Sequence, residues 1–203
     1  MSQQKFSIGE ALGFGWNTMK ANLGFFILLL IVIGILHIIP NIFQNMDLPG
    51  LSVLVNLAFF VLYLVIQMGM IKIVLKFNDG QKPALADLVA PYPLFFRYLF
   101  ASILYGLIVV CGLILLIVPG IVWAIKFQFF GYFIVDEGAG AVDSLKKSAA
   151  ITQGAKWDLF LLGICAMLIN LLGALCLMIG LFATIPTTFA AYANVYRKLK
   201  GNA

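Results

Sequence analysis

The sequence has little charge: only 10% of its 203 residues are Asp, Glu, Lys or Arg. A typical soluble domain has about 25% charged residues and about 45–50% apolar residues with glycine included. Here 63% of the residues are hydrophobic before the 19 glycines are counted. A soluble fold of this size cannot bury so much apolar side chain, so the composition excludes soluble, disordered and collagen-like chains. We therefore expect an integral membrane protein.

Residues that carry chemistry are also scarce. His37 is the single histidine, and the three cysteines, Cys111, Cys165 and Cys176, all lie inside apolar runs. An odd number of cysteines in apolar helices is typical of packing residues and not of a disulfide framework. No spacing resembles a metal site, and no glycine-rich phosphate loop is present. We therefore expect a protein that is not an enzyme, with no catalytic residue, no metal and no cofactor.

Long apolar runs fill most of the chain. A membrane span needs about 20 mostly apolar residues. Residues 22–40 and 51–77 each meet this length, and the stretch 41–50 between them contains Asn, Asp, Pro and Gly, which predicts a loop. No small-x-small cleavage site follows the first run, so we interpret it as a retained anchor and not as a cleaved signal.

Two further runs are longer than one crossing requires. Residues 98–135 as one helix would extend about 57 Å, whereas the apolar core of a bilayer is about 30 Å thick. Pro119-Gly120 predicts a turn in this run, because proline breaks a helical hydrogen bond and glycine tolerates the reversal. Residues 159–195 pose the same problem, and Gly180 predicts their turn. The chain is thus predicted to be an all-α, polytopic membrane helix bundle with six transmembrane helices.

The basic residues gather on one side of such a bundle. With six spans both termini face one compartment, and that face receives every Lys and Arg except Lys126, while the opposite loops carry only Asp47. The positive-inside rule then places both termini in the cytoplasm and the protein in the inner (cytoplasmic) membrane. Anionic lipid head groups attract such a face by about 1 kcal/mol for each nearby Lys or Arg. The alternative is that the bias only sets the topology.

A weak repeat divides this single membrane domain, residues 1–203, into units at about 6–77, 83–136 and 141–199. Each unit contains a short amphipathic segment, a basic residue and two spans joined by a tight outer turn. The segments are predicted to form short cytoplasmic helices, which lie either along the inner leaflet or beneath the bundle. Because every unit has two spans, the units share one orientation, unlike the inverted repeats of many carriers.

Local signals support the helices that precede the first and third pairs of spans. Ser7 and Glu10 have the spacing of a capping box. Asp143 and Lys147 form an i,i+4 pair in the favoured order. The corresponding segment of the second unit is shorter.

Few polar side chains lie within the predicted spans. No Asp or Glu is central in any of them, which disfavours a carrier that uses a buried carboxylate. Lys126 is the one charge well inside a span, and it either snorkels to the outer interface or forms an anion site or a contact to a lipid phosphate. Asn56 and Asn170 each form an interhelical hydrogen bond or bind a ligand. The possible intramembrane polar site therefore consists of Lys126, Asn56 and Asn170.

Several short motifs resemble a known bacterial pattern. They are Leu116–Ile121, Phe127–Phe133, Asp136 and Ala141–Leu145, and the N-terminal Glu10-Ala11-Leu12 also fits. In these motifs the chain resembles a superfamily of bacterial six-span membrane proteins of unknown function, related to the membrane domain attached to some glycerophosphodiester phosphodiesterases. The resemblance implies a fold and a membrane location, and it provides no catalytic residue. We expect no phosphodiesterase activity, because the 203 residues leave no room for that domain.

These features favour a non-enzymatic multi-pass inner-membrane protein that organises lipid or a membrane partner. One alternative is a permease or export component for a small anionic or amphipathic solute, with Lys126 in its path. Another is a regulatory membrane subunit of a lipid-active enzyme. The expected partners are anionic lipid head groups at the cytoplasmic face. Nucleic acid is not expected, because the basic residues are dispersed along a membrane face. The sequence specifies no protein partner.

Overall fold

The computed structural model describes residues 5–44, 49–176 and 179–201, and all regular structure in these ranges is helical. Asp47 lies outside the described residues, as does the side chain of His37. The all-α expectation is thus confirmed for this part of the chain. In chain order the helices are α1 (Ile8–Ala21), α2 (Leu23–Gln44), α3 (Pro49–Asn78), the 3-10 helices η1 (Leu85–Leu88) and η2 (Tyr92–Leu94), α4 (Phe95–Leu115), α5 (Ile117–Phe127), α6 (Phe130–Glu137), α7 (Ala141–Ile151), α8 (Lys156–Leu175) and α9 (Leu181–Gly201).

Four helical segments of the described residues are long and apolar enough to cross a membrane. A fifth is present if α1 and residues 23–36 of α2, which meet at 88°, form one broken span. These lengths and compositions indicate a membrane-associated protein. α9 is not among them, because Pro186, three threonines and a basic C-terminal turn lower its hydropathy. The four segments are Val53–Asn78, Leu85–Leu115, Ile117–Glu137 and Lys156–Leu175.

The loop predicted at residues 41–50 is helical at both of its ends, and its middle, residues 45–48, lies outside the described residues. Residues 41–44 continue α2 beyond Pro40, and Pro49 already belongs to α3. Ile42 and Phe43 continue the apolar run beyond Pro40, and proline is compatible with the first turn of a helix, where Pro49 lies.

The reversal after α4 occurs at Leu116 and not at Pro119-Gly120. Leu116 has an extended backbone (φ −164°, ψ 147°), and Pro119 lies in the first turn of α5. A proline is tolerated there because an N–H in the first helical turn has no helical acceptor to lose. Gly120 instead permits close packing, since a Cβ at Gly112 would lie 2.8 Å from the Gly120 Cα.

The last two helices turn at Gly180, as predicted. A Cβ at Gly180 would lie 2.6 Å from the backbone oxygen of Gly173, so these glycines also let two helices meet closely. The α4–α5 and α8–α9 hairpins therefore share one device, a pair of glycines in contact beside the turn.

The segments expected to form amphipathic helices differ from one another. Ser7 caps α1, and its Oγ accepts a hydrogen bond from the Glu10 N–H at 3.4 Å. The second segment forms only η1 and η2, because Pro91 and Pro93 fix their own φ angles and lack N–H donors. α7 is a regular helix, and it packs against α4, α5 and α6 instead of standing apart from them.

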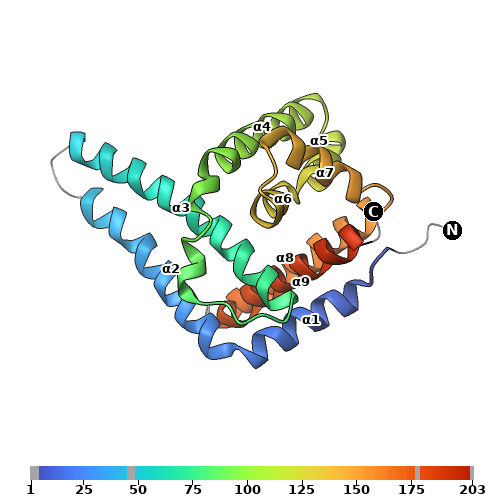
Figure 1. The fold of residues 1–203 in the computed structure, drawn as a ribbon, viewed down its shortest axis with the longest axis horizontal. Helices are drawn as coiled ribbons and strands as arrows, with labels where there is room; N and C mark the ends of the chain where they lie inside the picture. The colour runs from blue at the N-terminus through green and yellow to red at the C-terminus, as the bar shows by residue number, and fades with distance from the viewer. Residues whose placement is uncertain (1–4, 45–48, 177–178, 202–203) are drawn as a thin grey trace.

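The helices form two groups joined by α3 (Figure 1). α1, α8 and α9 pack together on one side, while α4 to α7 gather on the other. The α2–α3 hairpin extends away from both groups. Tyr196 and Leu199 of α9 are almost fully buried together with Phe129 and Leu162, so the core lies where the C-terminal half of α9 meets the rest of the chain.

Candidate functional site

An ion-pair network joins the C-terminal ends of three helices. The Arg197 guanidinium of α9 donates to both carboxylate oxygens of Asp79, which follows α3, at 2.9 and 2.6 Å. It also donates to Asp136 of α6 at 2.7 Å. The Tyr196 hydroxyl donates to the same Asp136 oxygen at 2.9 Å. Arg197 thus links α3, α6 and α9 through charge-assisted hydrogen bonds.

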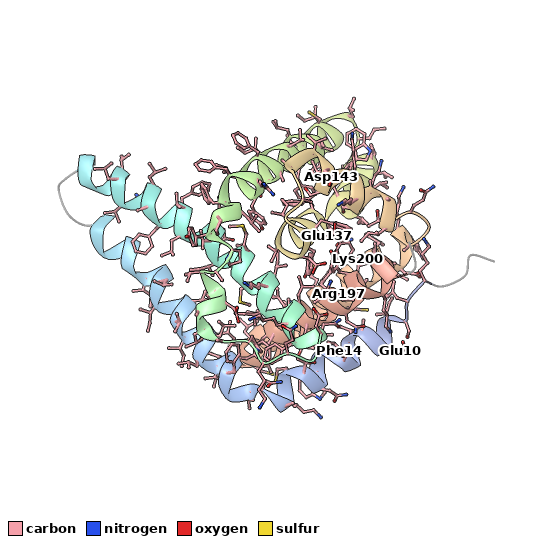
Figure 2. All side chains as sticks on the ribbon, in the orientation of Figure 1. Glu10, Phe14, Glu137, Asp143, Arg197 and Lys200 are labelled. Atoms are coloured by element: carbon pink, nitrogen blue, oxygen red, sulfur yellow. The ribbon has the colours of Figure 1, made fainter. Side chains whose placement is uncertain are left out.

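The network continues through α6 to α7. Lys200 lies 2.7 Å from Asp136 and 2.7 Å from Glu137. Lys147 of α7 lies 2.8 Å from Glu137 and 3.2 Å from Asp143, which confirms the predicted i,i+4 pair. The hydrogen bond to Glu137, together with the one to Asp143, raises the pKa of Lys147 above its ordinary value. Figure 2 shows Asp143, Glu137, Lys200 and Arg197 following one another from α7 to α9. We call Asp79, Asp136, Glu137, Asp143, Lys147, Tyr196, Arg197 and Lys200 the ion-pair network.

Other acidic residues are also neutralised within the protein. Glu10 of α1 lies 2.6 Å from Lys198 of α9. Asp87 lies 2.7 Å from Lys76 and 3.8 Å from Lys72, and it accepts a hydrogen bond from the Ala84 N–H. Because the acids are largely used in such pairs, the net positive charge resides on the remaining cations.

Several of these cations have no carboxylate partner among the described residues. Lys20 lies over the Trp16 ring, and the Arg97 side chain donates to the Gly138 carbonyl. Lys82 and Lys146 are exposed, whereas Lys126 and Lys156 are half-buried. A half-buried charge without a counter-ion is costly, so these last two lysines are the candidates for binding an anion. The cations in this set are Lys20, Lys82, Arg97, Lys126, Lys146 and Lys156.

Lys156 borders an apolar hollow between α5 and α8. The hollow has a volume of about 410 Å³. The Trp157 and Phe160 rings stack beside it, with their centroids 5.4 Å apart. A neighbouring hollow of about 330 Å³ shares part of this wall and adds Gln128, Tyr105 and Tyr192. We call the first the Lys156 hollow, and its lining is Val118, Ile121, Val122, Ile125, Lys156, Trp157 and Phe160.

Lys126 borders a second hollow on the other side of α5, toward α4. This hollow has a volume of about 470 Å³. The Lys126 ammonium lies 5.1 Å from the centroid of the Phe127 ring, which is within the range of a cation–π contact. Two of the hollows that α5 lines therefore contain one lysine each, and neither lysine has a carboxylate partner in the described structure. We call this one the Lys126 hollow, and its lining is Leu107, Ile108, Cys111, Trp123, Lys126 and Phe127.

The hydroxyl groups of Ser148 in α7 and of Thr152, its C-cap, hold the backbone at Lys126. The Ser148 hydroxyl donates to the Lys126 carbonyl at 3.0 Å and accepts from the Phe129 N–H at 3.1 Å. The Thr152 hydroxyl donates to the same carbonyl at 3.1 Å. These bonds satisfy backbone groups that the break between α5 and α6 leaves without helical partners, so they fix the position of Lys126.

The three residues proposed from the sequence lie on three different helices. Asn170 of α8 donates to the Thr188 hydroxyl of α9 at 3.4 Å, which is the expected interhelical bond. Asn56 is exposed on α3 and has no hydrogen bond among the described residues. Neither residue is part of the described lining of the Lys126 hollow. The structure therefore does not bring the three together into one site.

Lys156 and the ion-pair network were missed in the sequence. The sequence indicates Lys156 only as one of the basic residues of the expected cytoplasmic face. Its position directly before Trp157 and the following apolar run was the available signal, because aromatic and basic residues anchor helix ends at a membrane interface. The network had no such signal, since Asp79 and Arg197 are 118 positions apart.

Comparisons with known proteins find one family and distant relatives. Residues 84–197 match a family described as a domain of unknown function (DUF7847). Uncharacterized proteins of Mycobacterium bovis and of Mycobacterium tuberculosis are 27% identical over 149 residues. The match covers 71% of this chain and 44% of each relative, so the chain spans less than half the length of these relatives. No solved structure matches the chain. The results agree with a family of unknown function and give no link to the membrane domain of glycerophosphodiester phosphodiesterases.

Proposed function

The chain belongs to the DUF7847 family. From that membership, its apolar helices and two half-buried lysines without a carboxylate partner among the described residues, we propose a non-enzymatic multi-pass membrane protein that binds and organises anionic lipid. The proposed location is the bacterial inner membrane, with both termini in the cytoplasm. The ligand is a phospholipid with an anionic head group. The observation that carries the proposal is the pair of apolar hollows beside α5, each with a lysine that lacks a carboxylate partner among the described residues.

The ion-pair network supports six spans in three hairpins. The proposed units are residues 6–77, 83–136 and 141–199, and in each the second span ends close to the network. Asp79 follows the first of these ends, Asp136 lies at the second and Arg197 lies at the third. Three units of the same orientation bring equivalent ends to one face of the membrane, where ions are hydrated and can pair.

The chemistry of the hollows fits a phospholipid. Their walls are almost entirely apolar, so they offer a surface to acyl chains. An ammonium group binds phosphate as a point charge. At the Lys156 hollow, the stacked Trp157 and Phe160 rings add apolar aromatic surface beside the lysine. One lipid can therefore satisfy the apolar wall and the charge together.

Lipid analysis tests this function directly. We would extract the protein with its surrounding bilayer into native lipid discs and compare the lipids in the discs with the bulk membrane. The test variant carries Lys126→Met and Lys156→Met. The control carries Lys82→Met and Lys146→Met, which removes the same charge from two exposed positions.

We expect the wild type and the control to enrich anionic lipid several-fold over bulk, and we expect the test variant to lose most of this enrichment. Methionine keeps the length and apolar stem of the lysine, so the hollows remain filled in the same way. Absence of enrichment in the wild type would refute lipid organisation. Equal losses in both variants would show that net charge alone attracts the lipid.

A further inference from the structure

We propose that the phospholipid bound at Lys156 has ester-linked acyl chains, and that Tyr192 of α9 donates a hydrogen bond to one of its ester carbonyls. The inference rests on the proposed function and deepens it, since it names the class of lipid and a residue that selects this class. Its basis is the hollow of about 330 Å³ beside the Lys156 hollow. We call it the Tyr192 hollow, and its wall includes Tyr105, Gln128, Gly163 and Tyr192.

The two hollows are adjacent. Both are lined by Ile121 and Ile125 of α5 and by Phe160 of α8. Ile164 and Met167 line the Tyr192 hollow and are 40% and 71% exposed, so this hollow opens onto the exposed apolar face of α8. A single lipid can therefore extend from one hollow into the other along the surface of the protein.

The polar side chains of the Tyr192 hollow bond to the protein, with one exception. The Tyr105 hydroxyl donates to the Ala124 carbonyl at 3.3 Å, and the Gln128 amide donates to the Ile125 carbonyl at 3.1 Å. The Tyr192 hydroxyl has no hydrogen-bond partner among the described residues, although its side chain is half-buried. A tyrosine hydroxyl in a buried position usually has such a partner, and a molecule bound in the hollow can supply it.

Gly163 leaves room for an acceptor beside this hydroxyl. A Cβ at Gly163 would lie 3.6 Å from the Tyr192 hydroxyl oxygen, and outside its own stretch of helix it would meet no other described atom within 4 Å. The hydroxyl thus faces α8 at a residue that has no side chain. Gly163 follows Lys156 by seven residues, or about 10 Å along the helix. A cation for phosphate and a donor without an acceptor therefore lie along one apolar surface.

An ester-linked phospholipid matches this arrangement. Its phosphate is followed by glycerol esters, and each acyl chain begins at a carbonyl oxygen that accepts hydrogen bonds. An ether-linked chain has no carbonyl at this point. An ordered water matches less well, because it needs about two to four polar partners, and the Tyr105 and Gln128 side chains already donate to the backbone.

Competition between two lipids tests the inference. The full chain with Lys126→Met, which leaves one lysine beside α5, is incubated in detergent micelles with equal amounts of diester phosphatidylglycerol and its diether analogue. Mass spectrometry measures the lipid that the purified protein retains. We expect a preference of about threefold or more for the diester lipid, as one neutral hydrogen bond provides. Retention of neither lipid above phosphatidylcholine would refute the lipid-binding function itself, and this inference with it.

Three variants in the same background locate the preference. Tyr192→Phe removes the donor and should retain both anionic lipids equally, still above phosphatidylcholine. Gly163→Ala places a methyl group beside the hydroxyl and should have the same result. Tyr105→Phe is the matched control, because that hydroxyl is bonded to the Ala124 carbonyl, and it should keep the preference. Equal retention of the two lipids by the background protein, a preference that persists in Tyr192→Phe or Gly163→Ala, or its loss in Tyr105→Phe would overturn the assignment.

Discussion

Arg197 is the residue on which the polar end of the bundle depends most. It binds Asp79 through two nitrogens and Asp136 through a third. Among the described residues, Lys200 is the other residue of α9 that forms an ion pair with these segments, through Asp136 and Glu137. Loss of the guanidinium would leave both carboxylates partly buried beside an apolar core.

Arg197→Met should therefore destabilise the fold. Hydrogen bonds to charged groups contribute about 1.5–3 kcal/mol to stability, and we expect a loss in this range. The measurement is the midpoint of thermal unfolding in a mild detergent. Lys198→Met is the matched control, because the exposed pair of Lys198 with Glu10 should contribute less than about 1 kcal/mol. Equal effects of the two substitutions would contradict the proposed importance of Arg197.

At the same scale, the sequence predicted single residues well where the relevant contact is local. Ser7 caps α1 through the Glu10 N–H, and Asp143 pairs with Lys147. In each contact the two partners are at most four positions apart in the sequence. Asp79 and Arg197 meet only because α3 and α9 end together, which no local pattern records. Lys126, Asn56 and Asn170 share polarity within apolar runs, and this property did not indicate whether their side chains would meet.

Among the helices, α7 has a role that its amphipathic pattern did not reveal. The Ser148 hydroxyl and the hydroxyl of the α7 C-cap residue, Thr152, bind the backbone where α5 ends and α6 begins. Residues 128–129 contain neither proline nor glycine, so the sequence gives no sign of a break there. The break depends on hydroxyl groups from a helix that follows it in the chain.

Ser148→Ala should loosen this junction. The substitution removes one hydrogen bond to the Lys126 carbonyl and leaves the buried Phe129 N–H without its acceptor, at a cost of about 1–3 kcal/mol. Amide hydrogen exchange should accelerate at residues 126–130. Ser102→Ala is the control, because the buried Ser102 hydroxyl has no hydrogen-bond partner among the described residues. Unchanged exchange in Ser148→Ala would contradict the role of α7.

The boundaries of the helices show what apolar length can determine. α3 was predicted at residues 51–77 and extends over 49–78, because an apolar run of that length specifies a span by itself. The turn after α4 was placed at Pro119 and occurs at Leu116, since proline is compatible with the first turn of a helix. A proline in an apolar run therefore indicates the region of a turn and not the residue at which the chain reverses.

For the whole molecule, the proposed topology places the ion-pair network and the exposed lysines in the cytoplasm. Substituted cysteines in a cysteine-free chain test this arrangement with a reagent that does not cross membranes. Lys82→Cys and Lys146→Cys should react only from the cytoplasmic side. Leu116→Cys and Ile179→Cys, both exposed at the turns, should react only from outside. Labelling of Lys82→Cys and Leu116→Cys from the same side would refute six spans.

Photolabelling by the lipid itself tests most directly whether the protein binds anionic phospholipid beside α5. An anionic phospholipid with a photoreactive group in its acyl chain is activated in liposomes that contain the wild type or the Lys126→Met, Lys156→Met variant. Mass spectrometry then locates the adducts. We predict adducts concentrated on residues 118–125 and at Phe160 in the wild type and several-fold fewer in the variant. Adducts spread evenly over the exposed faces of α2, α3 and α4, or equal labelling of both proteins, would contradict anionic-lipid binding beside α5.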